Sequence, residues 1–348
     1  MPHPFPPEAV PLLIDWYCAG HRDLPWRETR DPYAILVSEI MLQQTRAEAV
    51  KPYYHRFLAT LPTVKDLSEA DDALLHKLWE GLGYYSRVRN LKRAAIAVME
   101  RFGGVIPADF DALLSLPGVG RYTAGAVASI AYDIPVPAVD GNVLRVFSRL
   151  TGDDTDVLTP AAKTTAERAI APFVPSSGAG DLTQALIELG AVICTPGASP
   201  RCADCPLSLF CVAAREGRQG DLPVRKPKTK RRIESRTVLV LRTPDGRTVL
   251  RQRPDTGLLA GLYEFPCMDG HKSEQEVLAH LENLGLSVSA VLPLSASKHL
   301  FTHVEWQMVG FAVDISASCP LPDGWIFATP EEIDERYAIP SAYAAYRL

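Results

Sequence analysis

Apolar residues recur every three or four positions through most of residues 1–215, which is the spacing of amphipathic α-helices. The clearest stretch is residues 31–45, where Asp31 suits the N-cap and Pro32 suits the first helical position. Many short helices without strand patterns predict an all-α domain. Further helices are expected at residues 47–59, 71–79, 87–102, 109–115, 121–131, 141–150, 160–172 and 181–193.

The pattern changes after residue 236, where runs rich in β-branched residues replace the helical period. The first two runs flank Pro244-Asp245-Gly246, which is typical of the turn in a β-hairpin. A smaller domain of mixed α and β structure is therefore predicted at the C-terminal end. Its expected elements are strands at 237–243, 247–253 and 303–315, and a helix at 273–285 capped by Ser273 and ended by Gly285.

The chain has 348 residues, enough for two domains, and a net charge of −5, which by itself argues against a protein that coats nucleic acid. The charge is uneven, however: residues 1–220 sum to −4, residues 221–236 to +5 and residues 237–348 to −6. The middle segment has two prolines and no hydrophobic period. We therefore expect a helical domain at 1–220, a basic linker at 221–236 and a second domain at 237–348. The linker suits either a solvated hinge or a contact with phosphates.

Four of the seven cysteines fall close together, with the spacing C-x7-C-x2-C-x5-C. The first residues do not match the pattern of a secretory signal, so a disulfide framework is not expected. Four thiolates in one loop suit an iron–sulfur cluster or zinc, and the single C-x2-C pair favours the cluster; four unrelated thiols are the third alternative. The candidate ligands in this loop, 194–211, are Cys194, Cys202, Cys205 and Cys211.

Two glycines, Gly118 and Gly120, separate the helices expected at 109–115 and 121–131. Glycines at this spacing permit a tight turn and leave backbone N–H groups uncovered at the start of the next helix, which is a binding site for an anion. A helix-hairpin-helix at 109–131 would use these groups to hold a DNA phosphate without reading the base sequence. The alternative is a plain turn between two helices.

Two carboxylates stand in contrasting sequence surroundings. Glu39 is the only charged residue of an otherwise apolar stretch from Pro32 to Thr45, where burial would raise its pKa and fit it for general-acid chemistry. Asp140 precedes the helix expected at 141–150, where backbone amides would keep it ionised. A protonated and an ionised carboxyl together cleave glycosidic bonds. A structural ion pair for Glu39 and simple capping for Asp140 remain open.

Two adjacent aromatic residues are followed by four basic residues in the segment 81–93, GLGYYSRVRNLKR. Tyr84 at a glycine turn, followed by Arg87 and three more cations without an acid, suits a wedge that enters DNA with phosphates held beside it. The alternative is a pair of core tyrosines next to a solvated helix face.

Taken together, LPGVGRYTAGA, VDGNVLRV and the four-cysteine loop resemble the helix-hairpin-helix DNA glycosylase superfamily that carries a [4Fe–4S] cluster. LPWR (24–27), SEIMLQQT (38–45), GLGYYSRVRNL (81–91) and the second domain make the chain similar to the MutY-type adenine DNA glycosylases. That resemblance covers nearly the whole chain. It implies removal of adenine opposite 8-oxoguanine or guanine from double-stranded DNA, after the base is flipped out of the duplex.

The resemblance also implies residue roles. Glu39 would protonate adenine at N7 and help to activate the water, and Asp140 would stabilise the sugar cation, with Tyr122 and Asn142 supporting these acids. Endonuclease III-type enzymes have a lysine where this chain has Tyr122, which implies a monofunctional glycosylase with little lyase activity. Tyr84 matches the wedge that inserts beside 8-oxoguanine, and Gln43 would be a neighbour of the lesion. The residues matching the adenine pocket are Trp26, Arg27, Leu42, Gln44 and Gln184.

The C-terminal domain resembles the Nudix-like domain of the same family over RPDTGLLAGLYEFP (253–266). The acidic metal-binding run of Nudix hydrolases is absent from 270–285, which implies a recognition module. Phe301-Thr302-His303 matches the family's Phe-Ser-His loop at the lesion, with threonine in place of serine. The loop from Cys194 to Cys202 encloses seven residues where the family usually has six.

Three alternatives are weighed against adenine release. A glycosylase of the same fold acting on thymine opposite guanine is the nearest, a catalytically silent damage-binding protein is the second, and a nucleotide-pool hydrolase is the third. A monomer is expected. No membrane association is expected, and the location would be cytoplasmic at the nucleoid in a bacterium, or nuclear or mitochondrial in a eukaryote.

Overall fold

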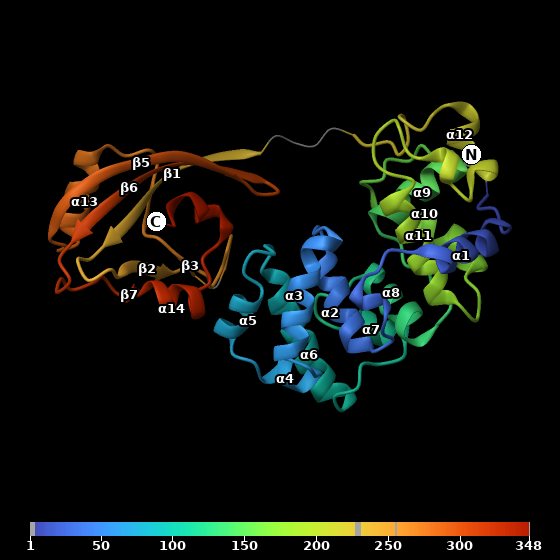
Figure 1. Ribbon diagram of the computed structural model, residues 1–348, viewed down its shortest axis with the longest axis horizontal. Helices are drawn as coiled ribbons and strands as arrows, with labels where there is room; N and C mark the ends of the chain where they lie inside the picture. The colour runs from blue at the N-terminus through green and yellow to red at the C-terminus, as the bar shows by residue number, and fades with distance from the viewer. Residues whose placement is uncertain (1–3, 227–230, 255, 348) are drawn as a thin grey trace. The chain divides into compact units, whose positions relative to one another are not determined.

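The computed structural model describes residues 4–226, 231–254 and 256–347. The chain divides into two compact units, which are described separately below. The first comprises residues 1–69 and 90–227, and the second comprises residues 70–89 and 228–348. Residues 227–230 of the predicted linker lie outside the described residues. The first unit is helical and the second contains a sheet, as the hydrophobic pattern predicts (Figure 1).

Helices account for the regular structure of the first unit among its described residues. The helices expected from periodicity are present within a few residues of their predicted bounds, and α1, α4 and α12 are additions to the prediction. Helix α5 and the start of α6 belong to the second unit. The helices up to residue 226 are α1 (Ala9–Gly20), η1 (Pro25–Arg27), α2 (Pro32–Leu42), α3 (Ala47–Thr60), α4 (Val64–Glu69), α5 (Asp72–Leu78), α6 (Ser86–Phe102), α7 (Phe110–Leu114), α8 (Arg121–Tyr132), α9 (Gly141–Thr151), α10 (Pro160–Ile170), η2 (Ala171–Phe173), α11 (Ala179–Val192), η3 (Cys202–Asp204), η4 (Ser208–Phe210) and α12 (Val212–Glu216).

Helix α2 begins where the sequence indicates and ends sooner. The Asp31 carboxylate accepts a 3.0 Å hydrogen bond from the Tyr33 amide, so it caps the helix as expected. The expected helical extent to residue 45 is wrong, because α2 stops at Leu42. Gln44 has a φ of 59°, a left-handed conformation that an α-helix cannot contain. This turn exposes the end of α2 to the pocket described below.

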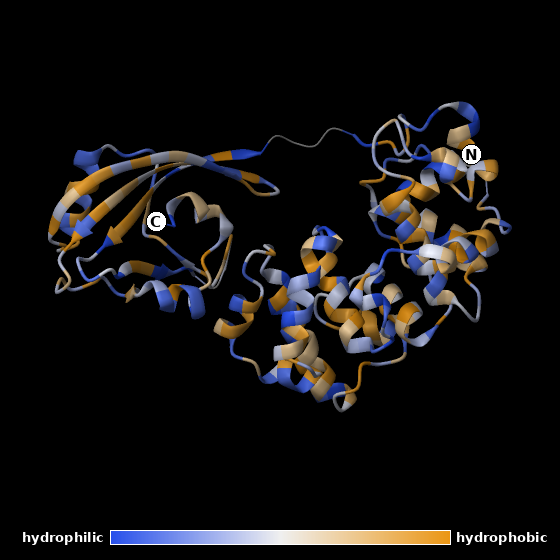
Figure 2. Cartoon of the chain, in the orientation of Figure 1, coloured by the Kyte–Doolittle hydropathy of each residue, from blue (hydrophilic) through white to orange (hydrophobic). Residues whose placement is uncertain are grey.

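Helices α9 and α11 form the centre of one hydrophobic core, with α1 and α10 packed around them. Apolar side chains on each helix face this core, while Figure 2 shows polar residues on the outward helix faces. Its most buried members include Leu13, Val143, Leu182 and Ala185. Because α9 carries Asp140 at its N-terminus, the packing of α9 against α11 fixes the position of that carboxylate.

The second unit is built on a mixed sheet with the strand order β3-β2-β1-β6-β5, to which β4 and β7 add by pairing with β1 and β2. The central pair, β1 and β6, runs parallel with Arg232 opposite Val304 and Arg242 opposite Asp314. Strand β1 begins within the segment expected to be the linker. The elements are β1 (Arg232–Arg242), β2 (Thr248–Gln252), β3 (Tyr263–Glu264), β4 (Cys267–Asp269), α13 (Glu274–Asn283), β5 (Val288–Leu300), β6 (Val304–Ile315), β7 (Trp325–Ala328), α14 (Pro330–Glu335) and η5 (Ser341–Tyr346).

The sheet is covered on both faces, as the alternation of side chains along β1 shows. Leu239 and Leu241 point to one face and pack with Val277 of α13. Val238 and Val240 point to the other face and belong to a cluster completed by η5 residues. Both faces of the sheet are therefore buried along the second half of β1, which agrees with the hydrophobic residues of this strand in Figure 2.

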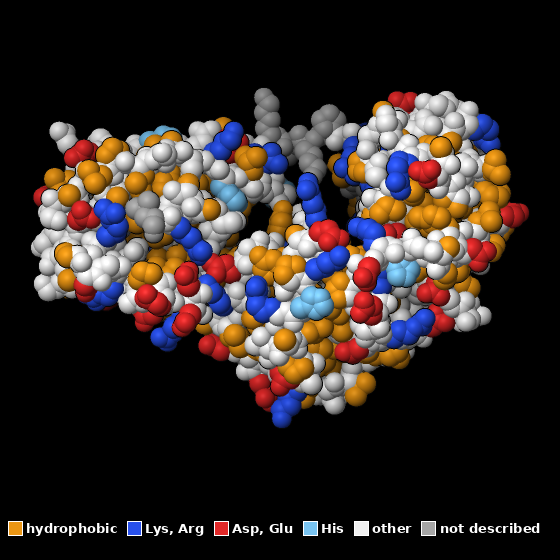
Figure 3. Space-filling model, in the orientation of Figure 1, with side chains coloured by type: hydrophobic (Ala, Val, Ile, Leu, Met, Phe, Trp, Pro, Cys, Tyr) orange, Lys and Arg blue, Asp and Glu red, His pale blue; other side chains and the backbone are white. Residues whose placement is uncertain are grey.

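Acidic and basic side chains are interspersed over each unit on the face shown in Figure 3. No broad single-sign field covers that face, in keeping with the small net charge of −5. Within the described parts of the chain, every helix is too short or too polar to span a bilayer.

Candidate active site

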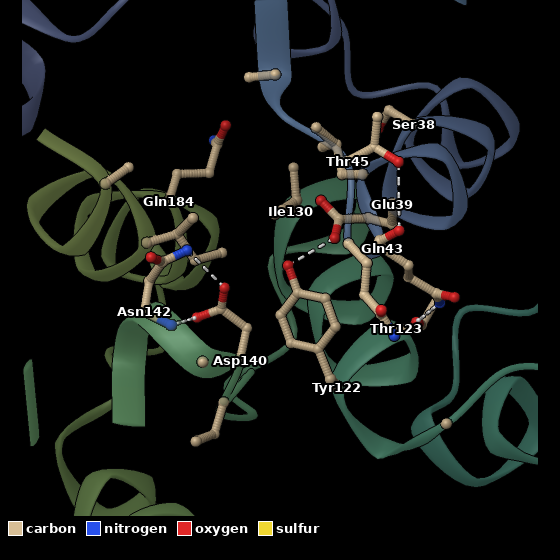
Figure 4. Close-up of a pocket in the computed structure, with 18 of the residues that line it drawn as sticks. Ser38, Glu39, Gln43, Thr45, Tyr122, Thr123, Ile130, Asp140, Asn142 and Gln184 are labelled. Carbon is tan, nitrogen blue, oxygen red and sulfur yellow. Dashed lines mark hydrogen bonds between the residues drawn. The ribbon is translucent and has the colours of Figure 1, made fainter. Parts of the chain in front are cut away.

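Glu39 and Tyr122 come from two helices that pack together, α2 and α8. The Tyr122 hydroxyl donates a 2.6 Å hydrogen bond to Oε2 of Glu39 (Figure 4). Glu39 is only 5% exposed, and every residue of α2 from Tyr33 to Met41 is buried. The structural ion pair considered from the sequence is not what holds Glu39, because its hydrogen-bond partner is the neutral hydroxyl of Tyr122.

Burial raises the pKa of Glu39 from its ordinary value to about 7, and the charge of Asp140 adds to the rise. The hydrogen bond from Tyr122 and the positive charge of Arg27 act in the opposite direction. A carboxyl with a pKa near 7 holds its proton in a large share of molecules at neutral pH and can give it to a substrate.

Asp140 is the N-cap of α9 and accepts three hydrogen bonds of 2.8 Å each. Its Oδ1 accepts from the backbone amides of Asn142 and Val143, and its Oδ2 accepts from the side-chain amide of Asn142. Both oxygens therefore accept N–H groups, which is the pattern of a carboxylate. Asn142 is thus held to Asp140 through both its backbone and its side chain.

The expectation that the helix amides would dominate the titration of Asp140 needs correction. Burial is the larger effect and raises its pKa above the ordinary value, although the hydrogen bonds from Val143 and Asn142 lower it. The sequence shows the capping position, but it does not show how deeply α9 and its neighbours bury the cap.

The two carboxylates line one pocket of about 1540 Å³. Figure 4 shows Tyr122 between Glu39 and Asp140, with Gln184 of α11 on the side of Asp140 and Gln43 on the side of Glu39. The structure therefore brings together residues from five separate parts of the sequence. The predicted site residues that line this pocket are Trp26, Arg27, Glu39, Leu42, Gln43, Gln44, Gly118, Gly120, Tyr122, Asp140, Asn142 and Gln184.

The two hairpin glycines do different things. Gly118 has a φ of +75°, and a Cβ there would lie 2.5 Å from Cβ of Asn90, so both its backbone conformation and its neighbour require glycine. Gly120 is the N-cap of α8 and has no side chain to cover the first amides of that helix. The hairpin thus leaves backbone N–H groups at the edge of the pocket, as the sequence predicts.

Glu188 of α11 is a functional candidate that the sequence analysis missed. It is 1% exposed and accepts hydrogen bonds from both Arg22 and Arg27, which line the pocket. The signal was available, because Glu188 is the only charged residue in the apolar run from Leu182 to Ile193.

In the second unit, residues 81–89 of the segment 81–93 divide their side chains between surface and interior. Tyr84 is 47% exposed, as a wedge would need, whereas Tyr85 is buried. Arg87 differs from the expectation of a phosphate contact: its side chain is buried, bonds to the carbonyls of Leu82 and Gly83, and lies over the ring of Trp79. Burial lowers the pKa of Arg87 to about 10.

The Phe301-Thr302-His303 loop joins β5 to β6 and lines a second pocket, of about 690 Å³, in the same unit. Tyr84 lines this pocket too, and its hydroxyl lies 3.2 Å from Oγ1 of Thr302. The structure therefore places the expected wedge tyrosine and the threonine that replaces the family's serine in contact.

The four clustered cysteines are half-buried free thiols that follow α11. Burial raises the pKa of Cys205 to about 11, and the three other thiols contribute electrostatically to that rise. Arg149 of α9 lies 3.5 Å from Sγ of Cys194. Within the described residues, no three Cys, His, Asp or Glu side chains are arranged to hold a single metal ion.

Comparison with known families now defines the class. HhH-GPD superfamily base excision DNA repair proteins match residues 37–172, and the NUDIX domain matches residues 237–346. A thermostable thymine-DNA glycosylase structure superimposes with a TM-score of 0.55 and 33% identity, over 60% of this chain and 96% of that one. A trapped endonuclease III–DNA covalent intermediate gives 0.51 and 25%, over 61% and 98%. The helical fold is thus that of a base excision DNA repair glycosylase.

Relatives that match most of this chain define its family within that class of glycosylases. The adenine DNA glycosylase of Mus musculus is 34% identical over 92% of this chain and 73% of its own length. That of Buchnera aphidicola is 30% identical over 84% of this chain and 82% of its own. The chain belongs to the adenine DNA glycosylase family. The family and the fold class expected from the sequence are both confirmed.

Proposed function

We propose that this enzyme hydrolyses the N-glycosidic bond of adenine opposite 8-oxoguanine or guanine in duplex DNA, after the adenine has been flipped into the first-unit pocket. One observation carries the proposal. Glu39 and Asp140 line the same pocket, and Glu39 has a pKa of about 7 while Asp140 accepts N–H groups at both oxygens. An acid and a carboxylate facing one cavity are what glycosidic cleavage requires.

Glu39 supplies the proton in this reaction. Its carboxyl protonates adenine at N7, so that the base leaves as a neutral molecule with the electrons of the C–N bond. The carboxylate that remains on Glu39 then accepts a proton from the attacking water. The Tyr122 hydroxyl stays bonded to Oε2 and keeps the acid facing the pocket.

Asp140 balances the positive charge that develops on the sugar as the bond breaks. Its carboxylate stabilises that cation, either as an ion or through a transient covalent bond to the sugar that water later breaks. Asn142 holds the carboxylate in place with a 2.8 Å side-chain bond. Tyr122 supplies no amine for a Schiff base, so the enzyme should be monofunctional, and strong borohydride trapping on DNA would contradict this.

The four cysteines fit a [4Fe–4S] cluster better than a zinc ion. All four are thiols in one loop, and Cys194, Cys202 and Cys211 act electrostatically on Cys205. The loop has a single C-x2-C pair, whereas structural zinc sites more often have two, and the four thiolates would be the ligands of the cluster. When bound, the cluster would crosslink the loop that follows α11.

We further propose that the second unit recognises 8-oxoguanine through Thr302 and Tyr84, whose side chains meet in its pocket. The threonine hydroxyl keeps the donor and the acceptor of the serine that it replaces. Double-stranded DNA is the partner that both units would bind, and the protein is proposed to act as a monomer.

The decisive experiment offers duplexes with adenine opposite 8-oxoguanine, guanine or thymine, and one with thymine opposite guanine, to the wild type, Glu39→Gln and Asp140→Asn. The wild type should release adenine from the first two, and both variants should lose most of that activity. Release of thymine instead would favour the thymine-specific alternative. Full activity of Glu39→Gln would remove its role as the acid.

Recognition of the lesion is tested with Thr302→Ala. This variant should lose discrimination between 8-oxoguanine and guanine by roughly five- to tenfold, as expected for one hydrogen bond, with a smaller effect on turnover. Ser297→Ala removes a hydroxyl from β5, outside the loop that carries Thr302, and is the matched control. It should leave the discrimination between 8-oxoguanine and guanine unchanged.

A further inference from the structure

A buried acid stands behind the wall of the first-unit pocket. Glu188 has 1% of its side chain exposed, and in front of it Arg22 and Arg27 line the pocket. Gln184, one helical turn earlier on α11, lines the pocket directly. Helix α11 therefore contributes Gln184, Ile187 and Ala191 to the pocket surface and Glu188 to the layer that supports it.

Glu188 binds the two arginines with both of its oxygens. Arg22 donates from Nε to Oε1 at 2.8 Å and from Nη2 to Oε2 at 2.6 Å, a bidentate pair, and its backbone amide donates to Oε1 at 3.1 Å. Arg27 donates from Nη2 to Oε2 at 2.7 Å and from Nη1 to the carbonyl of Arg22 at 3.0 Å. With two nitrogens held, the plane of the Arg27 guanidinium is fixed.

The cluster of Glu188, Arg22 and Arg27 acts electrostatically on the reacting acid, Glu39, through Arg27. Burial would raise the pKa of Glu188, but the hydrogen bonds from Arg22 and Arg27 outweigh it and lower the pKa to about 2, so Glu188 stays ionised at any pH of interest. Arg27, 5% exposed, acts electrostatically on Glu39. The other titratable groups that act on Glu39 are Tyr122 and Asp140.

We propose that Glu188 is a positioning residue of the glycosylase reaction, which fixes the Arg27 guanidinium at the pocket wall and balances its charge. The inference rests on the proposed function. With Glu188 in place, one oriented cation faces the pocket and the charge of the cluster is reduced by one. Without it, the half-exposed Arg22 and the buried Arg27 repel each other, and Arg27 loses the ionic partner that holds its orientation.

Removing the negative charge of Glu188 should change the pKa of Glu39. The surroundings become more positive, which favours the ionised form of Glu39 and lowers its pKa. Because Glu39 must carry a proton to act as the acid, the high-pH limb of the activity profile moves to lower pH. A displaced Arg27 also misorients the bound base, which lowers the rate at every pH.

The test measures single-turnover adenine release against pH for the wild type, Glu188→Gln and Glu188→Asp. We expect Glu188→Gln to be about tenfold slower at pH 7.5, with its high-pH limb about half a pH unit lower. Glu188→Asp keeps the charge on a side chain one carbon shorter, so it should recover the limb and part of the rate. Glu69→Gln, which removes an exposed acid paired with Lys65, is the charge-matched control.

A double variant separates positioning from a purely structural role. If Glu188 acts through Arg27, then Glu188→Gln should cause little further loss in an Arg27→Gln background. The inference would be overturned if the rate losses of the two single variants multiply in the double variant. It would also be overturned if Glu188→Gln folds and keeps the wild-type rate and the wild-type high-pH limb. If Glu188→Gln fails to fold, the test rests on Glu188→Asp. A reduced rate with the wild-type high-pH limb in Glu188→Asp supports the positioning role, and a wild-type rate in this variant overturns it. A wild type that releases no adenine would instead count against the proposed function.

Discussion

The hydroxyl of Tyr122 donates a 2.6 Å hydrogen bond to Oε2 of Glu39 inside the packing between α8 and α2. The bond lowers the pKa of Glu39, whereas burial of the same carboxyl raises it to about 7. Tyr122 therefore does two things at once. It orients the acid, and it prevents burial from making the proton too difficult to release.

The first prediction concerns Tyr122→Phe. Loss of the hydrogen bond removes an interaction that favours the ionised carboxyl, so the pKa of Glu39 should rise above 7. Activity requires protonated Glu39, and the high-pH limb of single-turnover adenine release should therefore move up by about one pH unit. The maximal rate should fall, because the acid is less well oriented.

Tyr132→Phe provides the control for that experiment. Tyr132 also lies on α8, but its hydroxyl donates to the carbonyl of Ile106 and not to a carboxylate. Its pH limb should match the wild type. A limb that moves to lower pH in Tyr122→Phe would show that the tyrosine acts on Glu39 in some other way.

The second prediction concerns stability. Below about pH 4.5 Glu39 is protonated in both the folded and the unfolded chain; between pH 4.5 and about 7 only the unfolded chain ionises it, which favours unfolding. At about 1.4 kcal/mol per pH unit this cost reaches roughly 3 kcal/mol above pH 7. Glu39→Gln, which still accepts the Tyr122 bond, should therefore be more stable than the wild type at pH 8.

Urea denaturation at pH 5 and pH 8 measures the difference. The advantage of Glu39→Gln should be small at pH 5 and approach its full value at pH 8. An equal advantage at both values would show that Glu39 is not protonated in the folded protein at pH 5.

The third prediction concerns Gly190 of α11. A Cβ at this position would lie 2.6 Å from Cβ of Asn142 and 3.0 Å from its Cα, closer than packed atoms allow. Gly190→Ala should push Asn142 away and loosen its hold on Asp140. We expect about a tenfold loss of adenine release and a destabilisation of roughly 1–3 kcal/mol.

Gly20→Ala is the matched control, because a Cβ at the end of α1 meets nothing within 4 Å. That variant should keep its activity and gain up to about 1 kcal/mol of stability from the better helix former. A Gly190→Ala enzyme with unchanged activity would mean that α9 and α11 can separate without moving Asp140.

The fourth prediction concerns the cysteine loop. The purified wild type should contain iron and inorganic sulfide and absorb visible light, and Cys205→Ser should lose most of all three. Cys18→Ser, which changes an exposed thiol outside the loop, should keep them. One zinc per chain and no iron in the wild type would overturn the cluster assignment.

The sequence predicts most of the helices of the first unit because their apolar periods are long and their caps are explicit, as at Asp31. It fails where backbone geometry at one residue decides the outcome: α2 ends early because Gln44 takes a left-handed conformation. Strand β5 was missed because its side chains are largely exposed or half-buried, so it lacks a clear apolar alternation.

The candidate site shows the same division. Glu39 and Asp140 could be selected from their local surroundings, but the burial that raises the pKa of Asp140 comes from packing between helices. Arg87 seemed basic and accessible in the sequence, yet the turn at Gly83 folds it back onto carbonyls and the Trp79 ring. Charge in a sequence indicates a partner, and only the fold decides whether that partner is DNA or the chain itself.

The parallel pairing of β1 with β6 also sets an order of events during synthesis. Arg232 finds its partner only when Val304 has been made, and Arg242 waits for Asp314. Until then β1 is an apolar strand with an open edge, which can pair with another chain. A polypeptide whose synthesis stops before residue 304 would therefore lack part of its second unit and would also carry an exposed strand edge prone to aggregation.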